Sequence, residues 1–169
     1  AIATLTNSGV PHENFMPYND SNCTSIPDAT TLDEASKFKI LSALKIDRNI
    51  NAIKGALFTG HPILTSVRLG NNFGAINQNN PIWLPNNTHS TSGHALLIVG
   101  YNDNYLYNGS SYGVFKVQNS WGSSFANNGY FYIKYTDLMK NSIHPAQFLT
   151  FLVPSFQDDQ VNLSDNLVV

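Results

Sequence analysis

His94 and Asn119 are the residues whose types and positions could perform chemistry together. His94 begins the apolar run 95–99, which is too short and too rich in β-formers for a helix and predicts a strand. Residues 112–118 alternate in character and predict a second strand that delivers Asn119 at its end. If the two strands are neighbours, the Asn119 oxygen can accept a hydrogen bond from one imidazole N–H. That bond fixes the direction of the other ring nitrogen, as a catalytic imidazole requires.

Several further motifs surround this pair. The chain reads G-H-A-x-x-x-V-G-Y at 93–101, N-S-W-G at 119–122 and G-Y-F at 129–131. Upstream lie a glycine, a glutamate, M-P-Y and a cysteine within 9–23, and a helix-like stretch followed by G-H-P-I-L within 51–64. This series of motifs resembles the papain-like (C1 family) cysteine peptidases from about residue 9 to residue 154. Where that family usually carries a second W-G, this chain has Phe125-Ala126.

The resemblance implies an α+β fold in which an antiparallel, barrel-like β half packs against a helical half. By this resemblance, residues 1–35 are a remnant of the helical half, residues 36–155 form the β half, and residues 156–169 are a tail.

The resemblance also assigns roles to individual residues. It implies that His94 is the catalytic histidine, that Asn119 orients it, and that Trp121 shields their hydrogen bond from water. Gly93 and Ala95 would line the pocket for the second substrate side chain before the cleaved bond, and Thr150 would form its floor. These small side chains predict room for an apolar group.

The family's nucleophilic cysteine has no counterpart in this sequence. The chain has 1 cysteine, Cys23, in a polar turn beside Asp20, where neither an imidazole nor a helix N-terminus favours a thiolate. We therefore interpret Cys23 as a disulfide partner or an idle thiol. The resemblance implies that a missing segment or a companion chain carries the nucleophile and any disulfide mate of Cys23. The chain also begins with Ala rather than Met, so we expect its true N-terminus to lie elsewhere.

Three functions remain open on the sequence alone. The first is a cysteine endopeptidase or exopeptidase, inactive without the missing nucleophile, that acts on peptide or protein substrates. The second is a catalytically dead, peptidase-like module that binds or inhibits. The third is a papain-like acyl-transfer enzyme with other chemistry.

Composition argues against several other classes of protein. The net charge is −2 and only 12% of residues are charged, so neither nucleic acid nor an anionic membrane is an expected partner. No apolar run approaches the ~20 residues of a membrane span. The other four histidines have no ligand at metal spacing, and we expect neither a metal nor another cofactor. The many Asn and Ser residues and the family resemblance favour an extracellular, secretory or lysosome-like location.

The remaining elements are predicted from local patterns. Helices are predicted to end near Gly9 and to cover about 51–59, the second capped by Asp47 or Asn49 and stopped by Gly60. Strands are predicted at 63–69, 94–99, 112–118, 129–135 and 147–153, with a turn at Gly100 and a hairpin at Asn108-Gly109. Residues 11–31 and 70–91 are predicted loops, and 32–44 fits either a helix or, at 37–41, a strand. Trp83 is either a core anchor or a substrate contact.

Overall fold

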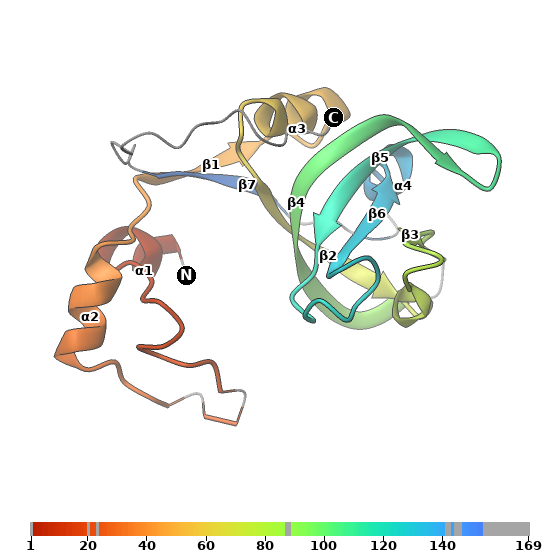
Figure 1. The fold of residues 1–169 in the computed structure, drawn as a ribbon. Helices are drawn as coiled ribbons and strands as arrows, with labels where there is room; N and C mark the ends of the chain where they lie inside the picture. The colour runs from red at the N-terminus through yellow and green to blue at the C-terminus, as the bar shows by residue number, and fades with distance from the viewer. Residues whose placement is uncertain are drawn as a thin grey trace, which may run out of the picture. The chain divides into compact units, whose positions relative to one another are not determined.

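The computed structural model describes residues 2–19, 21–22, 24–86, 89–140, 143 and 147–153, with only the backbone described at 89–92. Cys23 and the predicted tail 156–169 lie outside these residues. The described residues form two compact units, one within 2–44 together with 151–153 and one within 45–150. The polypeptide passes from one unit to the other within β1 (Ser42–Ile46) and within β7 (Phe148–Leu152) (Figure 1).

The first unit contains the two N-terminal helices, α1 (Ile2–Asn7) and α2 (Ala29–Ser36). At the end of α1, the N–H groups of Ser8 and Gly9 both donate to the Thr4 carbonyl at 2.9 Å. Gly9 has a φ of 86°, and a Cβ there would lie 1.9 Å from the Ala35 carbonyl oxygen of α2, so only glycine fits. The predicted helix end at Gly9 is confirmed.

The helix α2 corrects two predictions. The Asp28 carboxylate accepts a hydrogen bond from Thr31 N–H at 2.8 Å, which caps the helix and lowers the pKa of Asp28. The predicted loop therefore ends at Asp28 rather than Thr31. The ambiguous stretch 32–44 is neither one helix nor a strand at 37–41, because α2 ends at Ser36 and β1 starts at Ser42.

The second unit is built on a sheet. Its other strands are β2 (Ile63–Gly70), β3 (Ile82–Trp83), β4 (His89–Tyr107), β5 (Ser110–Gln118) and β6 (Tyr130–Lys134). The strand order is β1-β7-β2-β4-β5-β6-β3, and β3 pairs parallel to β6 while the β7-β2-β4-β5-β6 neighbours pair antiparallel. The helices α3 (Ile50–Phe58) and α4 (Tyr135–Leu138) and the 3-10 turn η1 (Phe73–Ala75) complete this unit. The short helix α4 was missed because Tyr135, its first residue, continues the alternation of β6.

The strand β4 is much longer than predicted. It begins at His89 and continues past Gly100 to Tyr107, so His94 lies within the strand and not at its entrance (Figure 1). The pairing with β5 shifts between Ile98 and Gly100 and again between Asn102 and Tyr105. At such bulges turn-forming residues bend a strand without ending it, which is why the predicted stop at Gly100 was wrong.

The far end of β4 is fixed by side chains and by a tight turn. Asp103 accepts hydrogen bonds from Lys54 Nζ at 2.6 Å and from the Tyr135 hydroxyl at 2.8 Å. The Lys54 bond, with the Tyr135 bond, holds the pKa of Asp103 below its ordinary value. Asn108 and Gly109 have φ values of 49° and 76° and join β4 to β5 as the predicted hairpin turn.

The predicted loop 70–91 contains structure that its Asn and Gly content concealed. Phe73 in η1 and Ile82 and Trp83 in β3 are all buried. The indole N–H of Trp83 donates to Asn72 Oδ1 at 3.3 Å, and its ring is 0% exposed. The core interpretation of Trp83 is therefore confirmed, and a substrate contact is ruled out by its burial.

The helix α3 starts at the expected place, and Asn49 rather than Asp47 caps it. Asn49 Oδ1 accepts a hydrogen bond from Ala52 N–H at 2.8 Å. Ile53 is 0% exposed and attaches the helix to the core of the second unit. Gly60 follows the helix with a φ of 78°, as a helix stop requires.

Replacing Asn49 with Ala should lower the free energy of unfolding by about 0.5–2 kcal/mol, because a first-turn N–H loses its acceptor. Asn49→Asp replaces the amide oxygen with a carboxylate oxygen, which can accept the same hydrogen bond, and should retain most of the stability. Urea denaturation of the three proteins measures the difference. Equal midpoints for Asn49→Ala and the parent would show that this cap contributes nothing.

Candidate active site

His94 is positioned by the central strand of the sheet. It pairs with Val67 of β2 and shares one face of β4 with Leu96 and Ile98, which are 4% and 0% exposed. The imidazole therefore lies at the end of a row of buried side chains and is itself only partly buried.

Asn119 follows β5 directly and its carboxamide meets the imidazole. His94 Nε2 lies 2.7 Å from Asn119 Oδ1. The same oxygen accepts a hydrogen bond from Ser120 N–H at 2.9 Å, which identifies it as the oxygen of the amide. Because Oδ1 can only accept, His94 Nε2 carries the proton and donates. In the neutral ring, His94 Nδ1 is then left as an unprotonated acceptor.

The Asn119 side chain is held firmly. Asn119 is 7% exposed, and its backbone N–H donates to the Gly129 carbonyl at 2.9 Å. Gly129 has a φ of 87°, its N–H donates to the Phe125 carbonyl at 2.7 Å, and a Cβ there would approach Gly122 O to 3.1 Å. The glycine before Tyr130 thus allows the 119–129 loop to close back onto Asn119.

One polar atom in the pair is unsatisfied. Asn119 Nδ2 is buried and has no hydrogen-bond partner among the residues that the structure describes. An unpaired buried donor costs about 1–3 kcal/mol.

Aromatic rings pack on the imidazole from two sides. The Trp121 ring lies 5.3 Å from the His94 ring, tilted by 45°, and the Phe73 ring lies 5.7 Å away at 63°. Phe125, at the place of the family's second W, stacks on Phe73 at 5.7 Å and meets Trp121 edge-on at 5.1 Å. Trp121 remains 48% exposed, so this indole covers the imidazole while half of its own surface faces outward.

Phe73 is the site residue that the sequence reasoning missed. It is 2% exposed and lies between the imidazole and the deeper core rings of Trp83 and Phe131. The available signal was a single apolar side chain in the Asn- and Gly-rich stretch 70–74, directly after the predicted strand 63–69. An apolar side chain in such a stretch is either exposed to solvent or buried in the core, and Phe73 is buried.

The structure does not bring all predicted pocket residues together. Gly93 and Ala95 flank His94 and are exposed on the opposite face of β4. Thr150 lies in β7, is 3% exposed, and donates its hydroxyl to the Pro62 carbonyl at 2.8 Å. The pairing of Leu64 with Leu149 sets Thr150 beside Ile63, whereas His94 pairs with Val67. Ile63 and Val67 are four residues apart on β2, which corresponds to about 13 Å along the strand.

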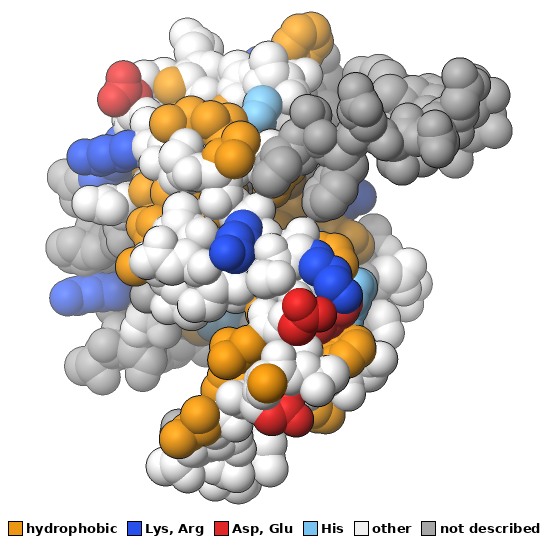
Figure 2. Space-filling view, turned by 90° about the vertical axis from the view of Figure 1, so that its left-hand side faces the viewer, with side chains coloured by type: hydrophobic (Ala, Val, Ile, Leu, Met, Phe, Trp, Pro, Cys, Tyr) orange, Lys and Arg blue, Asp and Glu red, His pale blue; other side chains and the backbone are white. Residues whose placement is uncertain are grey.

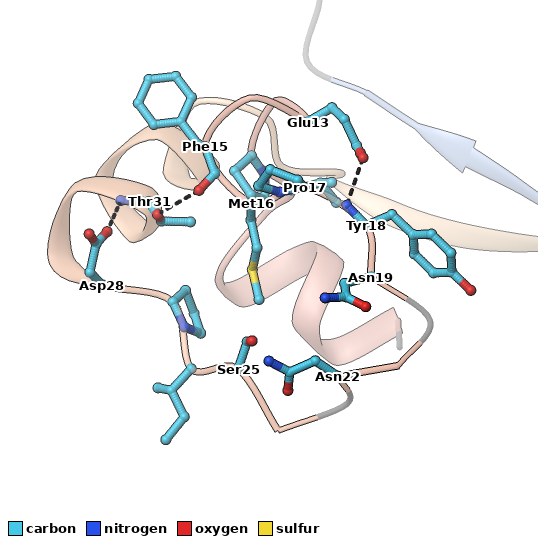
Figure 3. Close-up of a pocket in the computed structure, with 14 residues that line it drawn as sticks. Glu13, Phe15, Met16, Pro17, Tyr18, Asn19, Asn22, Ser25, Asp28 and Thr31 are labelled. Atoms are coloured by element: carbon cyan, nitrogen blue, oxygen red, sulfur yellow. Dashed lines mark hydrogen bonds between the residues drawn. The ribbon is translucent and has the colours of Figure 1, made fainter.

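The first unit contains a hollow of its own, with a volume of about 670 Å3. Figure 3 shows that the loop 10–28 surrounds it, with the Met16 side chain extending across it. The two acidic side chains that line it are engaged with backbone N–H groups, Glu13 with Tyr18 at 2.7 Å and Asp28 with Thr31 at 2.8 Å. Among the described lining residues, both carboxylates are therefore bonded to the backbone of their own loop. Several apolar side chains around it are exposed, among them Phe15, Met16, Tyr18 and Ile26.

Neither a metal site nor a membrane-spanning helix is found in the part of the chain that the structure describes. No cluster of three or more His, Cys, Asp or Glu residues that could hold a metal ion occurs there. No helix in this part is long and apolar enough to cross a membrane. Apolar side chains do reach the surface at several points, as the face drawn in Figure 2 shows.

An imidazole oriented by an asparagine on neighbouring antiparallel strands is the acid–base part of hydrolases that use a Cys-His-Asn constellation. A family model described as papain family cysteine protease matches residues 1–148. The chain therefore belongs to the papain family of cysteine proteases.

Solved structures agree with this assignment at the level of fold. Xylellain, a cysteine protease from Xylella fastidiosa, is 22% identical in sequence and aligns with a TM-score of 0.74. The alignment covers 90% of this chain and 60% of the xylellain chain. The bromelain protease from Ananas comosus is 18% identical, with a TM-score of 0.64 over 89% of this chain and 66% of its own. The predicted papain-like α+β fold is confirmed.

A relative by sequence is an uncharacterized peptidase C1-like protein of Acanthamoeba polyphaga mimivirus. It is 28% identical over 145 residues, which cover 79% of this chain and 44% of that protein. The chain thus spans less than half of this relative and 60% of xylellain.

Proposed function

We propose that this chain supplies the histidine and asparagine of a papain-like cysteine peptidase whose nucleophilic cysteine lies on polypeptide outside these 169 residues. The observation that carries the proposal is the 2.7 Å hydrogen bond between His94 Nε2 and Asn119 Oδ1. It orients the ring and leaves His94 Nδ1 as the atom that can exchange a proton with a thiol.

The chemistry follows from the state of the imidazole. A cysteine thiol within reach of His94 Nδ1 would transfer its proton and form a thiolate–imidazolium pair. The thiolate attacks the peptide carbonyl, and the imidazolium then protonates the leaving amine. His94 next takes a proton from water, which hydrolyses the acyl-enzyme. Asn119 stays neutral throughout and keeps the ring in place, while Trp121 and Phe73 limit access of water to the Nε2 hydrogen bond.

The substrates are proposed to be peptides or proteins. Gly93 and Ala95 are small, exposed neighbours of His94 and carry no charge, which favours an apolar substrate side chain beside them. The buried hydroxyl of Thr150 is already bonded to Pro62, so we leave Thr150 out of this pocket. Cleavage within a chain and cleavage at its end are both compatible with this half of the site.

The proposed partner is the segment or companion chain that carries the cysteine. The half-exposed Trp121 supports a further contact at the site. Exposed apolar side chains around the hollow of the first unit support another. Cys23 is a candidate for a disulfide to this partner, which implies an oxidising, secretory or extracellular location.

The purified chain is expected to show no turnover on a panel of fluorogenic peptides, since no thiol is expected to reach His94. Turnover that disappears in Cys23→Ala would identify Cys23 as the nucleophile and overturn this part of the proposal. A longer polypeptide that contains an upstream cysteine should restore turnover, and replacing that cysteine with Ala should remove it. Peptide binding by the longer protein without any turnover would instead favour a catalytically inactive binding module.

A further inference from the structure

We propose that Asn108 is an acceptor for an N-linked glycan when the protein enters a eukaryotic secretory pathway. Asn108-Gly109-Ser110 is an N-x-S acceptor sequence whose middle residue is not proline. The inference rests on the proposed secretory location and not on the peptidase chemistry, so either can fail without the other.

The position of Asn108 in the fold suits this modification. It is the first residue of the two-residue turn between β4 and β5, and Asn108, Gly109 and Ser110 are all exposed. Among the described residues, no hydrogen bond engages the Asn108 side chain. Its Nδ2 is therefore available to a transferase, and a large substituent on it would point into solvent. A neighbour in the sequence, Leu106, is 73% exposed.

The proposed reaction is a group transfer from a lipid-diphosphate-linked oligosaccharide. Nδ2 of Asn108 attacks the anomeric carbon of the first sugar and loses one proton, which balances the charge of the released diphosphate. The new bond joins that carbon to Nδ2, and the bond from the carbon to the diphosphate oxygen breaks. The lipid diphosphate leaves with the electron pair of the broken bond. The Ser110 hydroxyl completes the acceptor sequence.

The glycan would not disturb the candidate active site. Asn108 precedes β5 and Asn119 follows it, and the 9 residues of β5 between them separate the two by about 30 Å. The modified protein should therefore keep the kcat/KM of the unmodified one.

The chain offers closely matched control variants. Asn108→Gln and Ser110→Ala each destroy the acceptor sequence, Ser110→Thr keeps it, and Ser111→Ala changes the neighbouring serine outside it. The intact chain and these variants are expressed in a eukaryotic host behind a cleavable secretion signal. Only molecules from which the signal has been removed are analysed, because these have entered the secretory lumen.

The measurement is the sugar mass on Asn108 itself, located by fragmentation of the peptide that contains residues 101–116, because Asn86-Asn87-Thr88 upstream is also an acceptor sequence. We expect a sugar mass on Asn108 in the parent, Ser110→Thr and Ser111→Ala, and its complete loss in Asn108→Gln and Ser110→Ala. Reading the glycopeptide directly avoids confusion with spontaneous conversion of Asn108 to Asp. An unmodified Asn108 in signal-free parent protein, or a sugar mass that persists in Ser110→Ala, would overturn the proposal. Peptidase activity is assayed separately, so its absence does not affect this outcome.

Discussion

Replacing His94 with Ala in the cysteine-bearing protein is expected to abolish measurable peptide hydrolysis. General acid–base catalysis alone accounts for about 10²–10⁴-fold in rate. The same substitution also removes the partner that ionises the thiol. The loss in kcat/KM should therefore exceed the acid–base contribution. Because the ring contacts the reacting groups and not the bulk of the substrate, the loss should appear mainly in kcat.

Asn119→Ala should leave a measurable fraction of the activity. The asparagine exchanges no proton, and its removal costs only the orientation of His94 and the preferred tautomer. Asn119→Gln keeps a neutral carboxamide whose oxygen can accept from Nε2, so it should retain more of the kcat/KM than Asn119→Ala. Equal kcat/KM in Asn119→Ala and the parent would show that the asparagine does not orient the ring.

His61→Ala is the matched control for the histidine substitution. His61 lies in the turn after α3, and its Nδ1 bonds to Thr59 Oγ1 at 3.0 Å, away from the aromatic rings that surround His94. This variant should retain full activity. Near-wild-type kcat/KM in His94→Ala would place the catalytic base elsewhere and end the present assignment.

The His94–Asn119 pair could be predicted because it depends on local patterns. A β-rich run begins at His94, an alternating strand ends at Asn119, and a short hairpin between them makes their strands neighbours. The cap at Asn49 and the glycine stop at Gly60 are similarly local. In each case the determining interaction lies within a few residues of the signal or across one tight turn.

What could not be predicted depends on contacts between distant segments. Gly100 reads as a turn, but pairing with β5 keeps β4 extended through its bulges. Phe73 and Trp83 lie in a polar stretch that resembles a loop, and only the core formed by other strands shows that they are buried. The position of Thr150 depends on the pairing of β7 with β2, which no local pattern in β7 specifies.

Phe73→Ala is expected to produce the largest loss of stability near the site. Removing a buried phenylalanine side chain typically costs about 3–5 kcal/mol, from lost burial and from the cavity that remains. Phe73 is 2% exposed, and its ring contacts five aromatic neighbours, namely Trp83, His94, Trp121, Phe125 and Phe131. Phe73→Leu fills much of the cavity and should cost less.

The control for this substitution separates stability from support of the imidazole. Phe148 in β7 is 1% exposed, and no ring contact joins it to His94 or Trp121 in the described part of the chain. Phe148→Ala should therefore cost a similar free energy of unfolding while leaving the site rings in place. Denaturant unfolding measures the free energy of unfolding. Two signals report whether the site rings stay in place. They are the NMR signals of the His94 ring and the fluorescence of Trp121, which is the exposed one of the two tryptophans.

We expect the His94 and Trp121 signals of the folded protein to change in Phe73→Ala and to remain unchanged in Phe148→Ala. The reason is that the imidazole is bonded at Nε2, and the rings packed on it in the described part of the chain are those of Trp121 and Phe73. With Phe73 gone, Trp121 alone would limit its rotation, and Trp121 is itself half exposed. Unchanged signals in folded Phe73→Ala would show that the Asn119 hydrogen bond is sufficient to hold the ring. Phe73 would then be a core residue without a role in positioning His94.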